Sequence, residues 1–249
     1  MNTTKRIAII GATSAIAEHC ARQWAQQGKV ELILVGRDQK RLEIVAADLL
    51  VRSPNTKIEI VVSNFVDPNI IGKTVDVLFA TGPIDIALIA HGTLPEQTDC
   101  QNNLALNYKT LEINGISPAL HAEAFAQHMV ILNRGSIAII GSVAGDRGRK
   151  SNYVYGAAKG LVTRYAQGLQ HRFAGTEVCV TLIKPGPTNT PMTSAMKGSE
   201  AFASPEDVAR LILAGIDAKK AVIYAPAKWW LIMMIIRHLP SFIFNKMNI

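Results

Sequence analysis

Short β-branched runs alternate with longer amphipathic stretches along most of this chain, and no other feature restricts its fold as strongly. Such alternation is typical of βαβ units, in which helices cover both faces of a parallel sheet. We therefore predict an α/β fold, a single doubly wound domain with a parallel seven-stranded sheet. The expected strands are residues 6–10, 31–35, 57–62, 84–90, 136–140, 177–183 and 221–224.

The stretches between these strands predict helices at residues 14–27, 39–51, 68–79, 103–132, 153–172 and 205–216. Asp38 and Ser204 are expected to cap the second and last of them. Two segments do not fit the alternation. Residues 191–203 are expected to form a lid over a substrate, and the chain after Pro226 is expected to be an extension, residues 226–249, of a main domain formed by residues 1–225.

Composition narrows the function classes. With 249 residues, 49% of them apolar, the chain can bury one sizeable core, which excludes disorder. The formal net charge is +7, but the basic residues are scattered and aromatics are only 6%, so we expect no nucleic-acid binding. Phosphorylated ligands or lipid head groups fit this charge better.

The 3 cysteines are odd in number, far apart and free of any C-x-x-C spacing. Neither a disulfide framework nor a metal site is therefore expected, and a reducing cytoplasm is the simpler location. No apolar run reaches the length of about 18 residues that spans a bilayer.

The first expected strand runs into a turn of small residues, Gly11-Ala12-Thr13-Ser14-Ala15-Ile16-Ala17, and then into a helix. Small residues in that context let backbone N–H groups approach a pyrophosphate at the helix N-terminus. An ordinary strand-to-helix turn can have the same composition, so this motif alone leaves both interpretations open.

The second expected strand ends at Val35-Gly36-Arg37. Dinucleotide-binding folds place there either an acid for the 2′-hydroxyl of NAD or a base for the 2′-phosphate of NADP. A guanidinium fork suits a phosphate. Arg37 therefore favours NADP(H) over NAD(H), with Lys40 and Arg41 as further cations, and the alternative is that Arg37 is a solvated surface residue.

Tyr155 and Lys159 lie one helical turn apart, so both side chains can face the same ligand. A phenol with a pKa of about 10 exchanges protons poorly near neutrality unless a nearby cation lowers that pKa. Lysine at this spacing supplies the cation. However, Tyr224 and Lys228 have the same spacing, so the pair by itself carries little information.

Other motifs accompany the pair in a fixed order. Asn114 lies in the long helical stretch, Ser142 follows the fifth expected strand, and a Pro-Gly segment, residues 184–192, follows the sixth. Together they resemble the motifs of the short-chain dehydrogenases/reductases over about residues 5–225. The resemblance implies a Rossmann fold, a nicotinamide cofactor and oxidoreductase activity for this domain.

The resemblance also assigns roles to residues. Tyr155 would be the general acid that protonates the developing alkoxide, and Lys159 would lower its pKa and bind the nicotinamide ribose. Ser142 would donate a hydrogen bond to the substrate oxygen, and Asn114 would hold a water that links Lys159 to solvent. The expected cofactor contacts are Gly11, Thr13, Ser14, Ile16, Arg37, Asn64, Ala90, Gly92, Tyr155, Lys159, Pro185, Gly186, Thr188 and Thr190.

The chain departs from the family pattern at several positions. The second and third glycines of the turn are Ala15 and Ala17, which add a methyl group where backbone must approach phosphate or pack on a strand. The family's Asn-Asn-Ala-Gly appears as Ile89-Ala90-His91-Gly92, and the usual adenine-binding acid is Asn64. For His91, a structural role and a ligand contact both stay open.

The C-terminal extension is apolar and basic. It contains the run Lys228-Trp229-Trp230-Leu231-Ile232-Met233-Met234-Ile235-Ile236-Arg237, then Phe242-Ile243-Phe244 near Lys246, and no acid. Tryptophans and bases beside a short apolar run are typical of a helix in a membrane interface. The alternative is a contact helix of a homodimer or homotetramer.

The altered turn, Ala90-His91-Gly92 and this extension together resemble the branch that includes decaprenylphosphoryl ketopentose reductases. These enzymes act on a keto sugar carried by a polyprenyl phosphate.

The sequence thus predicts NADPH-dependent reduction of a ketone to a secondary alcohol. The substrate is expected to be a small-molecule or lipid-linked ketone, and residues 227–249 are expected to contact the inner face of the cell membrane. Within the same class, the alternative is a 3-ketoacyl or small carbonyl reductase, whose positive charge would meet an acidic carrier protein. From another class, the alternative is a catalytically silent NADP-binding scaffold.

Overall fold

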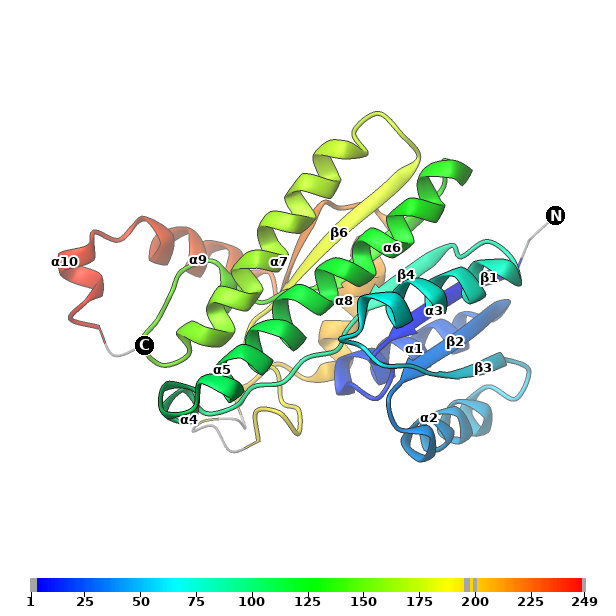
Figure 1. The fold of residues 1–249 in the computed structure, drawn as a ribbon, viewed down its shortest axis with the longest axis horizontal. Coiled ribbons are helices and arrows are strands. Elements are labelled where there is room, and N and C mark those ends of the chain that lie inside the picture. Colours follow the sequence, from blue (N-terminus) through cyan, green and yellow to red (C-terminus); the bar gives the residue numbers. More distant parts are fainter. Residues whose placement is uncertain (1–3, 195–197, 199–200, 248–249) are drawn as a thin grey trace.

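The centre of the molecule is a parallel sheet with the strand order β3-β2-β1-β4-β5-β6-β7 (Figure 1). It is seen in a computed structural model that describes residues 4–194, 198 and 201–247. The strands are β1 Lys5–Ile10, β2 Val30–Gly36, β3 Lys57–Val62, β4 Ile86–Ile89, β5 Gly135–Ile140, β6 Val178–Pro185 and β7 Val222–Ala225. The predicted doubly wound seven-stranded sheet is confirmed.

Helices connect successive strands and cover both faces of the sheet. They are α1 Ala15–Gln27, α2 Gln39–Arg52, α3 Pro68–Ala80, α4 Gln97–Asn102, α5 Leu104–Leu111, the π-helical turn η1 Glu112–Ile116, α6 Ser117–Leu132, the 3-10 turn η2 Val143–Gly145, α7 Tyr153–Arg172, α8 Pro205–Asp217, α9 Lys228–His238 and α10 Ser241–Phe244. The predicted caps are confirmed, since the side chain of Asp38 accepts a hydrogen bond from Arg41 N and that of Ser204 accepts one from Asp207 N.

Two hydrophobic clusters lie on opposite faces of the sheet. Helices α1, α2 and α8 pack on the face that Ile7 and Ile9 of β1 present. Helices α3, α6 and α7 pack on the other face, which receives Ala8 and Ile10. Because both faces of the sheet are covered, strands such as β1 and β2 are apolar almost throughout. This explains why they have few polar residues between the apolar ones in the sequence.

The expected single helix over residues 103–132 is wrong in detail. The side chain of Asn103 accepts a hydrogen bond from Leu106 N and begins α5, and α4 precedes it. The π-helical turn η1 then inserts an irregularity before α6. Gly115 in this turn packs so closely on α7 that an added Cβ would lie 3.2 Å from Ala158 Cα. Turns of this kind are frequent at functional sites.

The chain order places a crevice between β1 and β4. From β1 the chain continues to β2 on one side, whereas β4 pairs with β1 on the other side. In open α/β sheets, ligands bind at such a switch point, outside the carboxyl ends of the strands. Gly11, directly after β1, has φ +84°, and a Cβ there would lie 2.7 Å from the backbone nitrogen of His91. A side chain at this position would push apart the two loops that border the crevice.

The C-terminal extension lies at the end of the molecule opposite the N-terminus (Figure 1). Helix α9 is anchored by Met233, which is buried, and by Trp229, whose indole would collide with any Cβ added to Gly186. Arg147 donates hydrogen bonds to Ile236 O and Leu239 O, each at 2.6 Å. Among the described residues, no helix combines the length and apolar character needed to cross a bilayer.

Candidate active site

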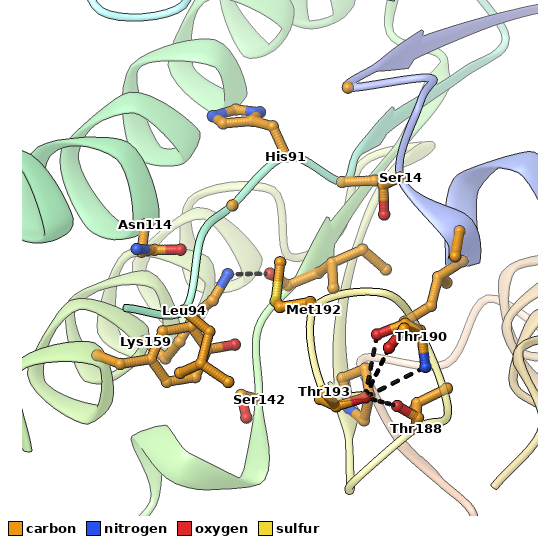
Figure 2. Close-up of a pocket in the computed structure, with 18 of the residues that line it drawn as sticks. Ser14, His91, Leu94, Asn114, Ser142, Lys159, Thr188, Thr190, Met192 and Thr193 are labelled. Carbon is orange, nitrogen blue, oxygen red and sulfur yellow. Dashed lines mark hydrogen bonds between the residues drawn. The ribbon is translucent and has the colours of Figure 1, made fainter. Parts of the chain in front are cut away.

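A cavity of about 800 Å³ opens at the carboxyl ends of the strands, at the switch point between β1 and β4. Every residue that the sequence nominated for the site, with the exceptions of Asn64 and Lys40, lines it. In Figure 2, Asn114, Lys159 and Ser142 lie on one side of this cavity and Thr188, Thr190 and Thr193 on the other. The tertiary structure therefore brings together residues from most of the chain.

Asn64 is not brought to the cavity. Its side-chain oxygen accepts a hydrogen bond from Val66 N at 2.9 Å, so the amide closes a turn of its own loop. The neighbouring Phe65 lines the cavity instead. The expected adenine contact of Asn64 thus has no support in the geometry.

Ser142 and Tyr155 meet on the inner wall of the cavity. Ser142 precedes η2, and its hydroxyl accepts a hydrogen bond from Ala144 N at 3.1 Å. Tyr155 lies in the first turn of α7, and a hydrogen bond with Ser142 lowers the pKa of its phenol. Burial acts in the opposite direction and prevails, raising the pKa of Tyr155 to about 12. The phenol therefore holds its proton at neutral pH.

Lys159 is buried one helical turn beyond Tyr155. Its ammonium donates a hydrogen bond to Ile140 O at 2.9 Å (Figure 2), and Nζ lies 5.8 Å from the centroid of the Tyr155 ring. Burial lowers the pKa of Lys159 to about 8. The lowered phenol pKa that the family resemblance implied is not found, because the ammonium is directed to a main-chain carbonyl and desolvation dominates the phenol.

Asn114 is fully buried in the π-helical turn η1. Its Oδ1 accepts a hydrogen bond from Thr93 N, and its Nδ2 donates one to Thr110 O, both at 2.9 Å. A Cβ on Gly92 would lie 2.8 Å from Asn114 Oδ1. The amide thus holds the loop after β4 against η1, and its expected role in holding a water stays a prediction.

The outer end of the cavity is basic. Arg37, directly after β2, and Arg41, in the first turn of α2, are exposed and line it. Asp38 also lines it, but one oxygen of its carboxylate accepts the hydrogen bond from Arg41 N. Lys40, the third expected cation, does not line the cavity.

His91 lines the cavity, but its ring is held by the protein. Nε2 lies 2.8 Å from Ser117 Oγ, and the ring centroid lies 4.7 Å from that of Phe65 and 5.2 Å from that of His121. Burial lowers the pKa of His91 well below its usual value, so the ring is neutral. These contacts favour the structural role.

The loop after β6 forms the wall opposite Lys159. Pro185, Gly186, Thr188 and Thr190 line the cavity, as expected. Thr193 is the centre of this loop, because its hydroxyl accepts a hydrogen bond from Thr190 N and donates one to Thr188 O (Figure 2). Residues 195–197 and 199–200 of the expected lid lie outside the described part of the chain, whereas Pro191 and Met192 line the cavity.

Sequence reasoning missed several residues of the site. Arg149 and Asn152, in the loop between η2 and α7, line the cavity near Tyr155, as does Leu94 on another loop. No motif marks them, because they belong to irregular segments whose direction depends on tertiary contacts.

Lys184 of β6 forms a buried ion pair with Asp146, which also accepts a hydrogen bond from Tyr224 of β7 at 2.8 Å. These contacts tie the loop after η2 to both strands. Tyr224 is thus committed to this network, which distinguishes it from Tyr155.

Comparisons with known proteins agree with this geometry. The sequence model of the family described as short chain dehydrogenase matches residues 5–201. An uncharacterized oxidoreductase of Staphylococcus epidermidis is 32% identical over 192 residues, which are 76% of this chain and 80% of that one. An uncharacterized oxidoreductase of Streptomyces coelicolor is 25% identical over 98% of this chain and 96% of its own.

Solved structures show the same fold. A short-chain dehydrogenase from Sphingobium yanoikuyae in complex with NADPH superposes with a TM-score of 0.81 at 23% identity, covering 98% of this chain and 96% of that one. Serine dehydrogenase from Escherichia coli superposes with a TM-score of 0.71 at 26% identity, covering 84% and 89%. The family match, these relatives and the arrangement of the cavity lead to one conclusion: the chain belongs to the short-chain dehydrogenase/reductase family of oxidoreductases.

Proposed function

We propose that this protein reduces a ketone to a secondary alcohol with NADPH, and that Tyr155 is the proton donor. One observation carries the proposal. The side chains of Ser142, Tyr155 and Lys159 line the same cavity at the switch point of the sheet, and Ser142 and Tyr155 share a hydrogen bond. Two hydroxyl groups side by side can donate to one carbonyl oxygen, which is where negative charge develops during reduction.

The residues of the cavity fit a dinucleotide. Gly11 allows the turn after β1 to lie against the loop of His91, at the place where a pyrophosphate meets the N-terminus of α1. Arg37 and Arg41 lie just after β2, where dinucleotide-binding folds hold the adenosine ribose, and would bind the 2′-phosphate of NADPH. Two structures with the same fold, from Sphingobium yanoikuyae and Shigella flexneri, were solved with NADPH and with NADP, which supports the same choice. When bound, the nicotinamide would supply hydride to the carbonyl carbon.

The proton for the alkoxide would come from the protein's own residues. Tyr155, whose pKa is raised to about 12, carries its proton at neutral pH and can give it to the forming alkoxide. Ser142 would donate a hydrogen bond to the same oxygen. Lys159 is a cation below its pKa of about 8 and would stabilise the phenolate that Tyr155 becomes.

Ketone-dependent oxidation of NADPH by the purified protein tests the activity. For the cofactor, we expect Arg37→Ala to lower kcat/KM for NADPH about 10- to 100-fold, because a charge-assisted contact to phosphate is lost. The value for NADH should change little. The matched control is Lys40→Ala, which removes a neighbouring cation that does not line the cavity. An equal loss with NADPH and NADH would contradict the assignment of Arg37.

We also propose that the C-terminal extension docks on an anionic membrane surface. In α9, Trp230, Leu231, Met234 and Ile235 are exposed, and at helical spacing they share a face opposite the packed Trp229 and Met233. Phe242 is 70% exposed in α10. Lys228, Arg237 and Lys246 supply positive charge, and residues 226–249 contain no acid. Basic apolar helices of this type bind anionic lipid interfaces.

A triple substitution tests the docking without removing the buried anchor of α9. We expect Trp230→Ser, Ile235→Ser and Phe242→Ser together to abolish cosedimentation with vesicles that contain anionic phospholipid. The matched control is Ile44→Ser, Val51→Ser and Ile131→Ser, which changes exposed apolar residues of α2 and α6. A wild-type protein that forms oligomers through this face and leaves the vesicles unbound would overturn the proposal.

A lipid-linked keto sugar, as in the decaprenylphosphoryl ketopentose reductases, would combine the proposed ketone reduction with the proposed membrane docking. Helix α9 follows β7 closely, and Trp229 packs against Gly186, a residue of the cavity. A surface held by this helix would therefore lie beside the active cavity. Reduction of a 3-ketoacyl or another small carbonyl substrate is the alternative within the same chemistry.

A further inference from the structure

Arg149 lies between two cavities. It lines the active cavity together with Tyr155, and it also lines a neighbouring cavity of about 380 Å³. The second cavity is bordered by Tyr153 of α7 and by Phe244 and Met247 of the C-terminal extension. The guanidinium therefore stands where a substrate that reaches Tyr155 would extend toward the tail.

Arg149 lacks the partners that the neighbouring arginine has. Arg147 donates hydrogen bonds to Ile236 O and Leu239 O, and its guanidinium lies 3.8 Å from the centroid of the Phe244 ring. The Nε atom of Arg149 is buried and has no hydrogen-bond partner, and no carboxylate pairs with Arg149 within the part of the chain that the structure describes. Arg147 thus holds the tail in place, whereas Arg149 donates no hydrogen bond from Nε to any of the described residues.

The charge around Arg149 is also unbalanced. Lys159 adds a second cation near Tyr155, and Arg149 acts electrostatically on the Tyr155 phenol. Asp38 is the acid among the described lining residues, and it caps α2 at the other end of the cavity. Asn152 contributes a buried side-chain oxygen that likewise has no partner in the described structure. The wall next to Tyr155 therefore presents an unpaired cation and an unpaired acceptor.

We infer that the substrate is a ketone that carries an anionic group, a carboxylate or a phosphate, and that Arg149 binds this group. The inference rests on the proposed ketone reduction and names its substrate class. The guanidinium fork matches the oxygens of either anion, and a buried N–H that the protein leaves unpaired is satisfied when they bind. The anion would sit at the mouth of the second cavity, so its remaining substituent can run along Phe244 and Met247.

Matched pairs of ketones test the inference. They are dihydroxyacetone phosphate with dihydroxyacetone, acetoacetate with methyl acetoacetate, and a ketopentose on a short polyprenyl phosphate with the free ketopentose. The measured quantity is the ratio of kcat/KM for the charged member to that for the neutral member. Because Arg149 also influences the pKa of Tyr155, the ratio is the proper readout: an effect on proton transfer cancels within each pair.

We expect the wild-type ratio to exceed one for at least one pair, and Arg149→Gln to lower that ratio about 10- to 100-fold. Arg149→Lys should restore part of it, since it returns the charge without the fork. The control Arg164→Gln removes an exposed charge of α7 away from the cavity and should leave the ratio unchanged. Equal unfolding temperatures and equal NADPH affinity of the variants establish that each one is folded.

The arms also identify the source of the anion. A dependence on Arg149 in the polyprenyl pair indicates a lipid-borne phosphate, and one in the dihydroxyacetone or acetoacetate pair indicates a soluble phosphate or carboxylate. Turnover of ketones with the same ratio in wild type and Arg149→Gln overturns the inference and leaves the proposed function standing. If the wild type reduces no member of any pair with NADPH, the proposed reduction fails, and the inference fails with it.

Discussion

Tyr155→Phe is expected to lower kcat for ketone reduction about 10²- to 10⁴-fold, the range that a positioned general acid contributes. The substitution removes the hydroxyl that meets Ser142 and retains the ring. NADPH binding should stay within about twofold, since the phosphate contacts lie elsewhere in the cavity. Single-turnover measurement of NADPH oxidation, with cofactor binding followed by fluorescence, separates the two effects.

The matched control for this prediction is Tyr165→Phe. Tyr165 lies on the same helix, but its hydroxyl is hydrogen-bonded to Glu123 at 2.9 Å and it does not line the cavity. This variant should keep wild-type turnover. Unchanged turnover in Tyr155→Phe would refute Tyr155 as the proton donor and would show that another group donates the proton.

The pH profile gives a second readout of the same chemistry. The pKa of Lys159 is lowered to about 8, so its ammonium is present below that pH and is lost above it. Because the ammonium would stabilise the phenolate left by proton transfer, kcat for reduction should fall as the pH rises through about 8. Tyr155, with a pKa of about 12, stays protonated across this range and does not cause the decline.

Gly145→Ala is expected to destabilise the protein by about 3 kcal/mol, at the upper end of the cost of overpacking. A Cβ at Gly145 would lie 2.6 Å from the carbonyl carbon and oxygen of Lys159 and 2.9 Å from Gly160 N. These are backbone atoms of α7 and cannot rotate away. The melting temperature should fall by about 6–12 °C, as judged from the usual relation for a domain of this size.

Gly148→Ala is the control for Gly145→Ala. It lies three positions later in the same loop, and a Cβ there meets no atom within 4 Å. Its unfolding midpoint in denaturant should match that of the wild type. Equal midpoints for Gly145→Ala and Gly148→Ala would show that η2 and α7 are not packed as closely as the structure has them.

Most elements of the fold could be predicted from the sequence, because they depend on local patterns. The stretch 153–172 coincides with α7, and the expected strand 57–62 with β3. The prediction of one helix over residues 103–132 was wrong, because the helical patterns of α5 and α6 run together in the sequence. Asn103 and the π-helical turn η1 interrupt the expected helix 103–132, and the close packing of Gly115 on α7 that accompanies η1 is a tertiary contact.

The candidate site, like the fold, could be predicted from the sequence only in part. Spacing nominated Tyr155 and Lys159, but it nominated Tyr224 and Lys228 equally. The structure separates the two pairs, because Tyr155 and Lys159 line the cavity whereas Tyr224 donates a hydrogen bond to Asp146. Asn64 was nominated by position in the family pattern, and the geometry turns its amide into its own loop. Arg149 has no sequence signal, since its role depends on which cavities its loop borders.

The amino-acid sequence alone predicts the order of strands and helices, the small-residue turn at the crevice and the residue types that the proposed proton transfer would use. These follow from periodicity and from the order of motifs, which are properties of neighbouring residues. The shifted pKa values of Tyr155 and Lys159 arise only in the folded protein, as does the difference between Arg147, which holds the tail, and Arg149, whose Nε has no partner among the described residues. Burial and hydrogen-bond partners arise between segments far apart in the chain, so they exist only once the chain has folded.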